Sequence, residues 1–133
     1  MMELDEMPNS VRELVTWLQE QGFALSEEQR KDGNNQRLVF ERDGWRIEVV
    51  ADRADWSVAV ASPGGRFVHP DIWEAYLDGF PLAGDLSPLQ HQIEFVRQDL
   101  ERIRAAAGPD VDRELKRMDE EYSRRLLGIG PPE

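Results

Sequence analysis

The chain of 133 residues contains no cysteine and only two histidines, His69 and His91. The first absence excludes disulfides, thiolate metal sites and cysteine nucleophiles. The two histidines form no H-x-x-x-H or similar ligand spacing, and neither a phosphate-binding glycine motif nor G-x-S-x-G occurs. We therefore expect a non-enzymatic protein without metal or cofactor, in which both histidines have structural or surface roles.

Long apolar runs are absent as well. No stretch approaches the ~18 apolar residues that a membrane-crossing helix requires. Residues 1–6 are acidic, whereas a signal peptide begins with basic residues. The sequence therefore predicts a cytoplasmic protein that does not bind membranes.

Basic segments are also missing, and the formal net charge is −11. Proteins that bind nucleic acids usually carry a basic patch, because contacts with phosphates dominate their affinity. Nucleic acid is therefore excluded as a partner. A basic protein partner is allowed because long-range attraction accelerates encounter, although acidity that only maintains solubility explains the same charge.

The first regular pattern that the chain does contain is helical. Apolar residues recur with helical spacing over residues 10–21. Ser10 and Glu13 have the spacing of a capping box, in which each side chain accepts a hydrogen bond from a free backbone N–H. Gly22 follows and suits the left-handed conformation that ends many helices.

An antiparallel meander is predicted next. A weak strand at 23–29 is followed by two alternating strands, 37–42 and 45–50, and by a last strand at 56–60. Between the second and third strands, Asp43-Gly44 is typical of a two-residue type I′ turn, which requires positive φ at both positions. Such a turn pairs Arg42 with Trp45, Phe40 with Ile47 and Leu38 with Val49.

The last third of the chain has three helical patterns, starting near Pro70, Ser87 and Pro109. Ser87 and Gln90 again have capping-box spacing. The last two helices have heptad-like apolar spacing around a tight break, which predicts an antiparallel helical hairpin. The sequence therefore predicts one α+β domain over residues 1–133, with helices on one face of a three- to four-stranded antiparallel sheet and flexible ends at 1–8 and 128–133.

Aromatic residues beside carboxylates are the best candidates for a binding surface, because interfaces use exposed aromatic anchors. Trp45 and Trp56 are predicted core residues, whereas Trp17 and Trp73 could flank the sheet or be exposed. The densest stretch, taken as the candidate partner-binding site, contains Asp71, Trp73, Glu74, Tyr76, Asp78, Phe80 and Asp85. The alternatives are that these aromatics are buried, or that the strand face with Glu41, Arg46 and Glu48 binds instead.

Three segments together resemble small immunity proteins of bacterial polymorphic-toxin systems. They are the strand region RLVFERDGWRIEVVADRADWSVAVAS, the short helix W-x-x-Y-L-x-G and the start of a long helix, SPLQHQIEFV. The resemblance covers roughly residues 10–107 and lies in element order. It implies an acidic, non-enzymatic protein that neutralises one cognate toxin by binding it.

The leading hypothesis is thus a protein-binding, immunity-like protein whose partner is a basic toxin domain. A chaperone or adaptor for a secreted protein is the first alternative, and an enzyme with an unrecognised site is the second. Homodimer formation is left open by the sequence.

Overall fold

The computed structural model describes residues 7–32, 35–79, 87–106 and 108–126. In this part of the chain the helices are α1 (Asn9–Glu20), α2 (Pro70–Asp78), α3 (Leu89–Ala106) and α4 (Pro109–Leu126). The strands are β1 (Ala24–Asp32), β2 (Asn35–Arg42), β3 (Trp45–Asp52) and β4 (Asp55–Ala61). The predicted flexible ends fall mostly outside the described residues.

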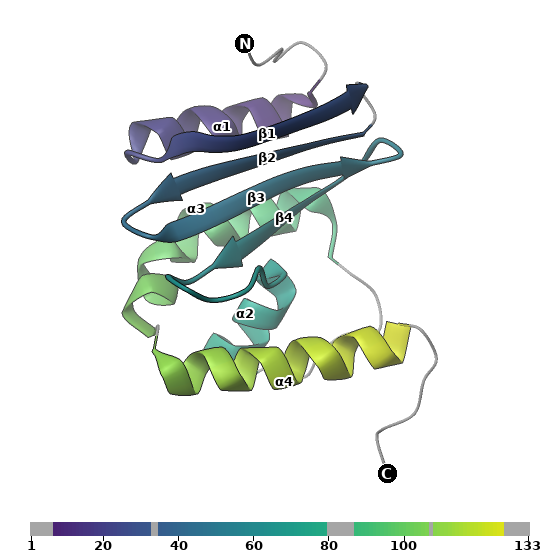
Figure 1. Ribbon diagram of the computed structural model, residues 1–133. Helices are drawn as coiled ribbons and strands as arrows, with labels where there is room; N and C mark the ends of the chain where they lie inside the picture. Colours follow the sequence, from purple (N-terminus) through teal and green to yellow (C-terminus); the bar gives the residue numbers. More distant parts are fainter. Residues whose placement is uncertain (1–6, 33–34, 80–86, 107, 127–133) are drawn as a thin grey trace.

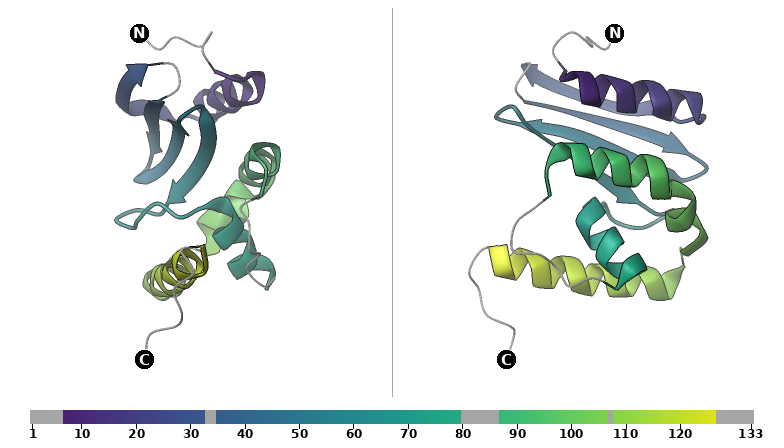
Figure 2. Two further views of the ribbon diagram at one scale, coloured as in Figure 1. Left: turned by 90° about the vertical axis from the view of Figure 1, so that its right-hand side faces the viewer. Right: turned by 180° about the vertical axis from the view of Figure 1, so that it is seen from behind.

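The strands form one antiparallel sheet in the order β1-β2-β3-β4. Helices α1 and α3 lie on one face of the sheet, and α2 and α4 lie beyond the β4 edge, while no described helix covers the other face (Figures 1 and 2). The predicted α+β class, with a leading helix, an antiparallel meander and C-terminal helices, is confirmed.

The β2–β3 hairpin forms as predicted. Asp43 and Gly44 have φ values of 52° and 85°, which a type I′ turn requires. Arg42 pairs with Trp45, and Phe40 pairs with Ile47. Because this register places alternate side chains on one face, the apolar set of both strands points toward the helices.

The core lies between the sheet and the helices. Its members alternate along the strands and recur with helical spacing on the helices. Trp45 and Trp56 are 6% and 8% exposed, so their predicted core positions are confirmed. From the helices, the core contains Val11, Leu14, Val15, Leu18, Ile93, Val96, Leu100, Ile103, Leu115 and Tyr122.

The first helix starts differently from the prediction. It begins at Asn9, its N-cap is Pro8, and no side chain caps it, so the predicted Ser10 cap is wrong. Pro8 is held in an extended conformation (φ −56°, ψ 151°), and its carbonyl accepts the first helical hydrogen bond from Arg12 N–H at 3.0 Å. Ser10 therefore lies inside the first turn. Gly22 has φ of 89°, so the left-handed conformation predicted there is confirmed.

The helices after the sheet also differ in detail. Helices α3 and α4 run in opposite directions, as a hairpin should, but α2 lies between them and contacts both (Figure 2). The predicted capping box at the start of α3 is wrong. Ser87 N–H donates to Asp71 Oδ2 at 2.7 Å, and the Gln90 amide donates to Glu94, one turn further along α3. The cap is thus replaced by a contact with α2.

Candidate functional site

The two described aromatic residues of the candidate α2 stretch, Trp73 and Tyr76, differ in how far they are buried. Trp73 is 0% exposed, and its Nε1–H donates to the Val60 carbonyl at 3.1 Å. Its ring lies 6.5 Å from that of Trp45, so Trp73 is a core residue, which is the alternative of a buried aromatic. Tyr76 is partly buried against the same core. Phe80 and Asp85 lie outside the described residues.

The carboxylates of α2 already have partners within the molecule. Asp71 accepts hydrogen bonds from both the N–H and the hydroxyl of Ser87. Glu74 lies 3.0 Å from His91 Nε2 and raises the pKa of that histidine, mainly through the hydrogen bond. Asp78 likewise accepts a hydrogen bond from the Arg102 guanidinium at 2.7 Å. These contacts connect α2 to the α3 region and leave its acids less available to a partner.

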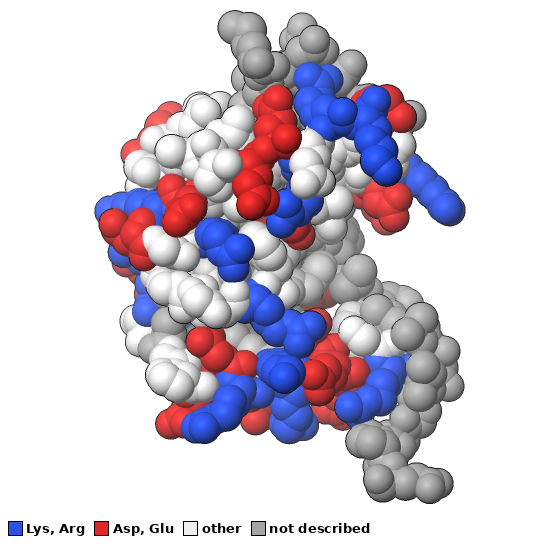
Figure 3. Space-filling model, in the orientation of Figure 1, with Lys and Arg blue, Asp and Glu red and all other residues white. Residues whose placement is uncertain are grey.

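Basic and acidic side chains are interspersed on the sheet face that the helices leave exposed (Figure 3). Arg37 donates to Glu27 and to Glu48, at 2.6 Å each. The guanidinium groups of Arg37 and Arg46 lie 5.6 and 4.6 Å from the centre of the Phe67 ring. Of the alternative strand surface, Arg46 and Glu48 therefore have contacts within the molecule, whereas Glu41 is exposed.

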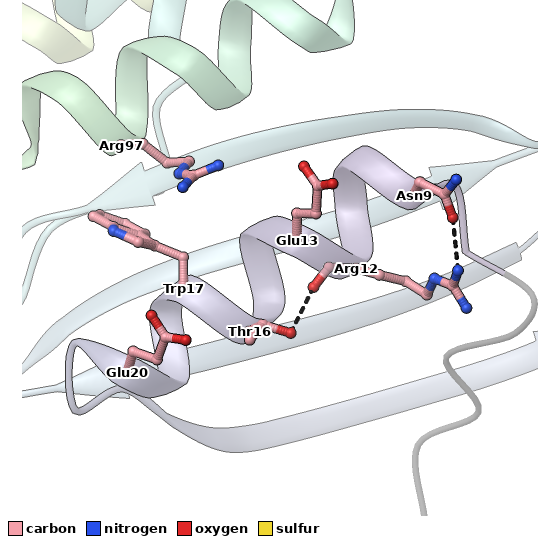
Figure 4. Close-up of a pocket in the computed structure, with 7 residues that line it drawn as sticks. All are labelled: Asn9, Arg12, Glu13, Thr16, Trp17, Glu20 and Arg97. Carbon is pink, nitrogen blue, oxygen red and sulfur yellow. Dashed lines mark hydrogen bonds between the residues drawn. The ribbon is translucent and has the colours of Figure 1, made fainter.

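A groove between α1 and α3 is different. Its volume is about 380 Å³, and Figure 4 shows the residues that line it: Asn9, Arg12, Glu13, Thr16, Trp17, Glu20 and Arg97. We call it the α1–α3 groove. Trp17 is partly exposed there, and Arg97 reaches from α3 to place its guanidinium 5.9 Å from the ring centre. Tyr76 of α2 is partly exposed as well, so the aromatic ring alone does not distinguish this groove from α2.

The two glutamates of the α1–α3 groove are exposed. Glu13 and Glu20 lie about one turn to either side of Trp17 along α1 (Figure 4). Within the described part of the chain, neither has an ion pair or a hydrogen bond through its side chain. By contrast, Arg12 donates to Asn9 Oδ1 at 2.6 Å. The groove therefore combines a partly exposed tryptophan with two carboxylates available to a partner.

The sequence contained a weak signal for this groove. Trp17 follows Leu14 by three residues, at the boundary of the buried stripe of α1, with Glu13 and Glu20 at i−4 and i+3. A tryptophan at the boundary of an apolar stripe can pack one side on the core and expose the other. The contribution of Arg97 could not be foreseen, because it comes from a helix eighty residues away in the chain.

His69 has a structural role of the kind that the sequence predicted for it. It caps α2, because its Nδ1 accepts the N–H of Asp71 at 3.0 Å. Burial lowers the pKa of His69, while Asp71 and Asp119 offset part of this effect. The Ser87 hydroxyl donates to the Asp71 carboxylate, whereas activation of a serine requires a hydrogen bond to its base. These residues therefore stabilise a helix start and do not form a nucleophile–base pair.

Two further observations bear on other classes of function. Among the described residues, no three His, Asp or Glu side chains gather as metal ligands. In the same residues, Leu25 is the one large apolar side chain classed as exposed, at 39%. A chaperone groove would require a broader apolar surface than this.

Comparisons of the chain with protein-family models, with curated proteins and with solved structures found no match. None of the helices, within the residues described, is long and apolar enough to cross a membrane. The site must therefore be interpreted from its own geometry.

Proposed function

We propose that this chain binds a basic protein through the α1–α3 groove, and that it works as an immunity-like protein neutralising a cognate bacterial toxin domain. The observation that carries the proposal is the partly exposed Trp17 between two carboxylates, Glu13 and Glu20, which have no partner among the described residues. Tryptophan is among the residues that most often dominate binding energy in interfaces. Carboxylates without internal partners can pair with a partner's Lys or Arg without first losing a contact.

In this proposal the net negative charge affects the association rate, and Trp17 affects the dissociation rate. The net charge of −11 attracts a basic protein from a distance and accelerates association. Trp17 then loses its remaining contact with water and slows dissociation. Arg97 already lies over the ring, so the partner contacts the accessible side of a tryptophan that is held in place from α3.

The experiment purifies the products of the genes adjacent to this one, tests the basic ones first, and titrates each against the chain in a kinetic binding assay. Replacement of Glu13 and Glu20 by Lys is expected to slow association and to weaken its dependence on salt. Trp17→Ala is expected mainly to accelerate dissociation, by about tenfold or more.

A matched control keeps the overall charge change the same. Glu41 and Asp55 are exposed and lie away from the α1–α3 groove, on the sheet. Their double replacement by Lys should reduce long-range attraction only, so its effect should be smaller than that of the groove variant. If the two double variants bind equally, or if Trp17→Ala binds like the unmodified chain, the groove is not the binding site. If the neighbouring protein does not bind at all, the immunity-like function is wrong.

A further inference from the structure

The two edges of the sheet differ in whether their outward-facing backbone groups have hydrogen-bond partners. At the β4 edge, Val60 exchanges backbone hydrogen bonds with Val68 at 2.9 Å in both directions. The Val58 N–H donates to Gln92 Oε1 at 3.0 Å. At the opposite edge, β2 is the one strand among the described residues that pairs with β1, and α1 lies behind the sheet rather than along this edge (Figure 2). Strand β1 therefore presents an open edge.

The backbone groups that face outward from β1 follow from its pairing. The Val39 carbonyl accepts the Ser26 hydroxyl, so it points toward β1, and Glu27 is the residue opposite Val39. In an antiparallel ladder, alternate residues direct their N–H and C=O groups to the same side. Glu27 and Gln29 therefore bond to β2, whereas Glu28 and Arg30 direct their backbone groups outward.

The charges on this edge are arranged symmetrically. We infer that a second copy of this chain pairs with β1, antiparallel to it, about a two-fold axis at Gln29. Glu28 then faces Arg30 of the second copy, and Arg30 faces its Glu28. A two-fold interface forms each such pair twice, and opposite charges on directly facing residues stabilise antiparallel strands. The outward backbone groups of the same residues are the ones that would exchange hydrogen bonds.

The composition of β1 also distinguishes this pairing from non-specific association. An edge with charges of one sign repels its own copy, which is a common protection against aggregation. Here both signs occur, and their order is complementary to itself only in one antiparallel register. Leu25, 39% exposed, lies on the same strand and adds apolar surface near the contact.

The contact is short, so the dimer is weak. Register shifts between Leu25 and Glu27 and between Arg30 and Asp32 leave residues 27–30 as the regular segment. The net charge of −11 on each copy opposes association further. We therefore expect a reversible dimer that forms in the upper micromolar to millimolar range, below the size and affinity of standard interfaces.

The test is sedimentation equilibrium of the full chain from micromolar to about millimolar concentration. Glu28→Arg should weaken dimerisation by about tenfold or more, because each substitution turns two attractive pairs into two repulsive ones. Arg30→Glu should act in the same direction. The double variant Glu28→Arg with Arg30→Glu restores opposite charges at both positions and should recover the dimer.

A backbone variant tests the pairing independently of charge. Glu28→Pro removes an N–H that faces outward, so the protein's own sheet should tolerate it while the dimer is lost. Glu41→Arg is the control, since it makes the same charge change away from the β1 edge.

The inference is overturned if the chain is monomeric at all concentrations. It is also overturned if a dimer forms that neither Glu28→Arg nor Glu28→Pro weakens. A double variant, Glu28→Arg with Arg30→Glu, that fails to restore association would overturn it as well. Circular dichroism confirms that each variant is folded.

Discussion

Helices α1 and α2 each carry a tryptophan among carboxylates, yet the structure uses them in opposite ways. On α2, Trp73 is completely buried. On α1, Trp17 is partly exposed, and the neighbouring Glu13 and Glu20 have no ion pair within the described residues. The acids of α2, such as Glu74, are instead engaged by side chains near or on α3.

The difference shows that a dense stretch of aromatic and acidic residues in a sequence is not always exposed or unpaired in the fold. A buried aromatic contributes to folding, and a paired carboxylate must lose its partner before it can bind another. Residues that look alike in the sequence are therefore separated by whether the fold has already used them. On this criterion the side chains of α2 are engaged mainly within the molecule, whereas Glu13 and Glu20 of α1 have no such contact among the described residues.

The largest expected effect separates the two tryptophans. Trp73→Ala should reduce the free energy of unfolding by about 3–5 kcal/mol, because it removes a completely buried ring and leaves a cavity. It also leaves the Val60 carbonyl without its indole donor. Trp17→Ala should cost less, since part of that ring is already in water. Denaturant unfolding of both variants measures the difference, and equal losses would contradict the assignment of Trp17 to the surface.

A smaller effect should separate the carboxylates. Asp71→Ala leaves the Ser87 N–H without its acceptor, so we expect a loss of about 1–3 kcal/mol in the free energy of unfolding. Asp71→Asn keeps one carbonyl acceptor and should lose less. Replacing both Glu13 and Glu20 by Ala should change stability by no more than about 0.5 kcal/mol, as for ordinary surface positions. A large loss in the α1 variant would show that its acids are structural after all.

Local chemistry explains what the sequence could predict about the fold. The Asp43-Gly44 turn set the register of β2 and β3, because two adjacent residues with positive φ define one hairpin geometry. Apolar spacing likewise identified the buried faces of the helices. The Ser10 cap failed because Pro8 is already extended and its carbonyl starts the helix one residue earlier.

The candidate site could be predicted only in part, because it depends on contacts between distant segments. Ser87 and Asp71 are 16 residues apart, and the Ser87 cap was replaced because α2 supplies a stronger, charged acceptor. Trp73 carries the same local signals as an exposed anchor, and only the position of α2 against β4 buries it. Conversely, Trp17 is identified as accessible only once α3 is placed beside α1.

The smallest expected effect is a change of stability with pH that is confined to α2, because both histidines contact that helix. His69 caps α2, and His91 contacts Glu74 on it. Burial lowers the pKa of His69 below its usual 6.5. Above pH 6.5 neither state of this histidine is charged, but below it the unfolded chain takes up a proton that the folded chain resists. Stability from His69 is therefore lost as the pH falls from 6.5 toward the folded-state pKa. Protonation would also remove the Nδ1 acceptor that caps α2.

His91 acts in the opposite direction, because its hydrogen bond to Glu74 raises its pKa above 6.5. Its stabilisation is present below pH 6.5 and is lost as the pH rises through the raised folded-state pKa. Unfolding free energies between about pH 5 and pH 8 separate the two contributions.

His69→Asn keeps a side-chain cap that does not titrate. The free energy of unfolding of this variant should therefore rise as the pH falls, because only the contribution of His91 remains. His91→Gln should instead make the loss at low pH steeper. If hydrogen exchange shows that the pH response loosens α1 as much as α2, the division of roles between the two helices is wrong.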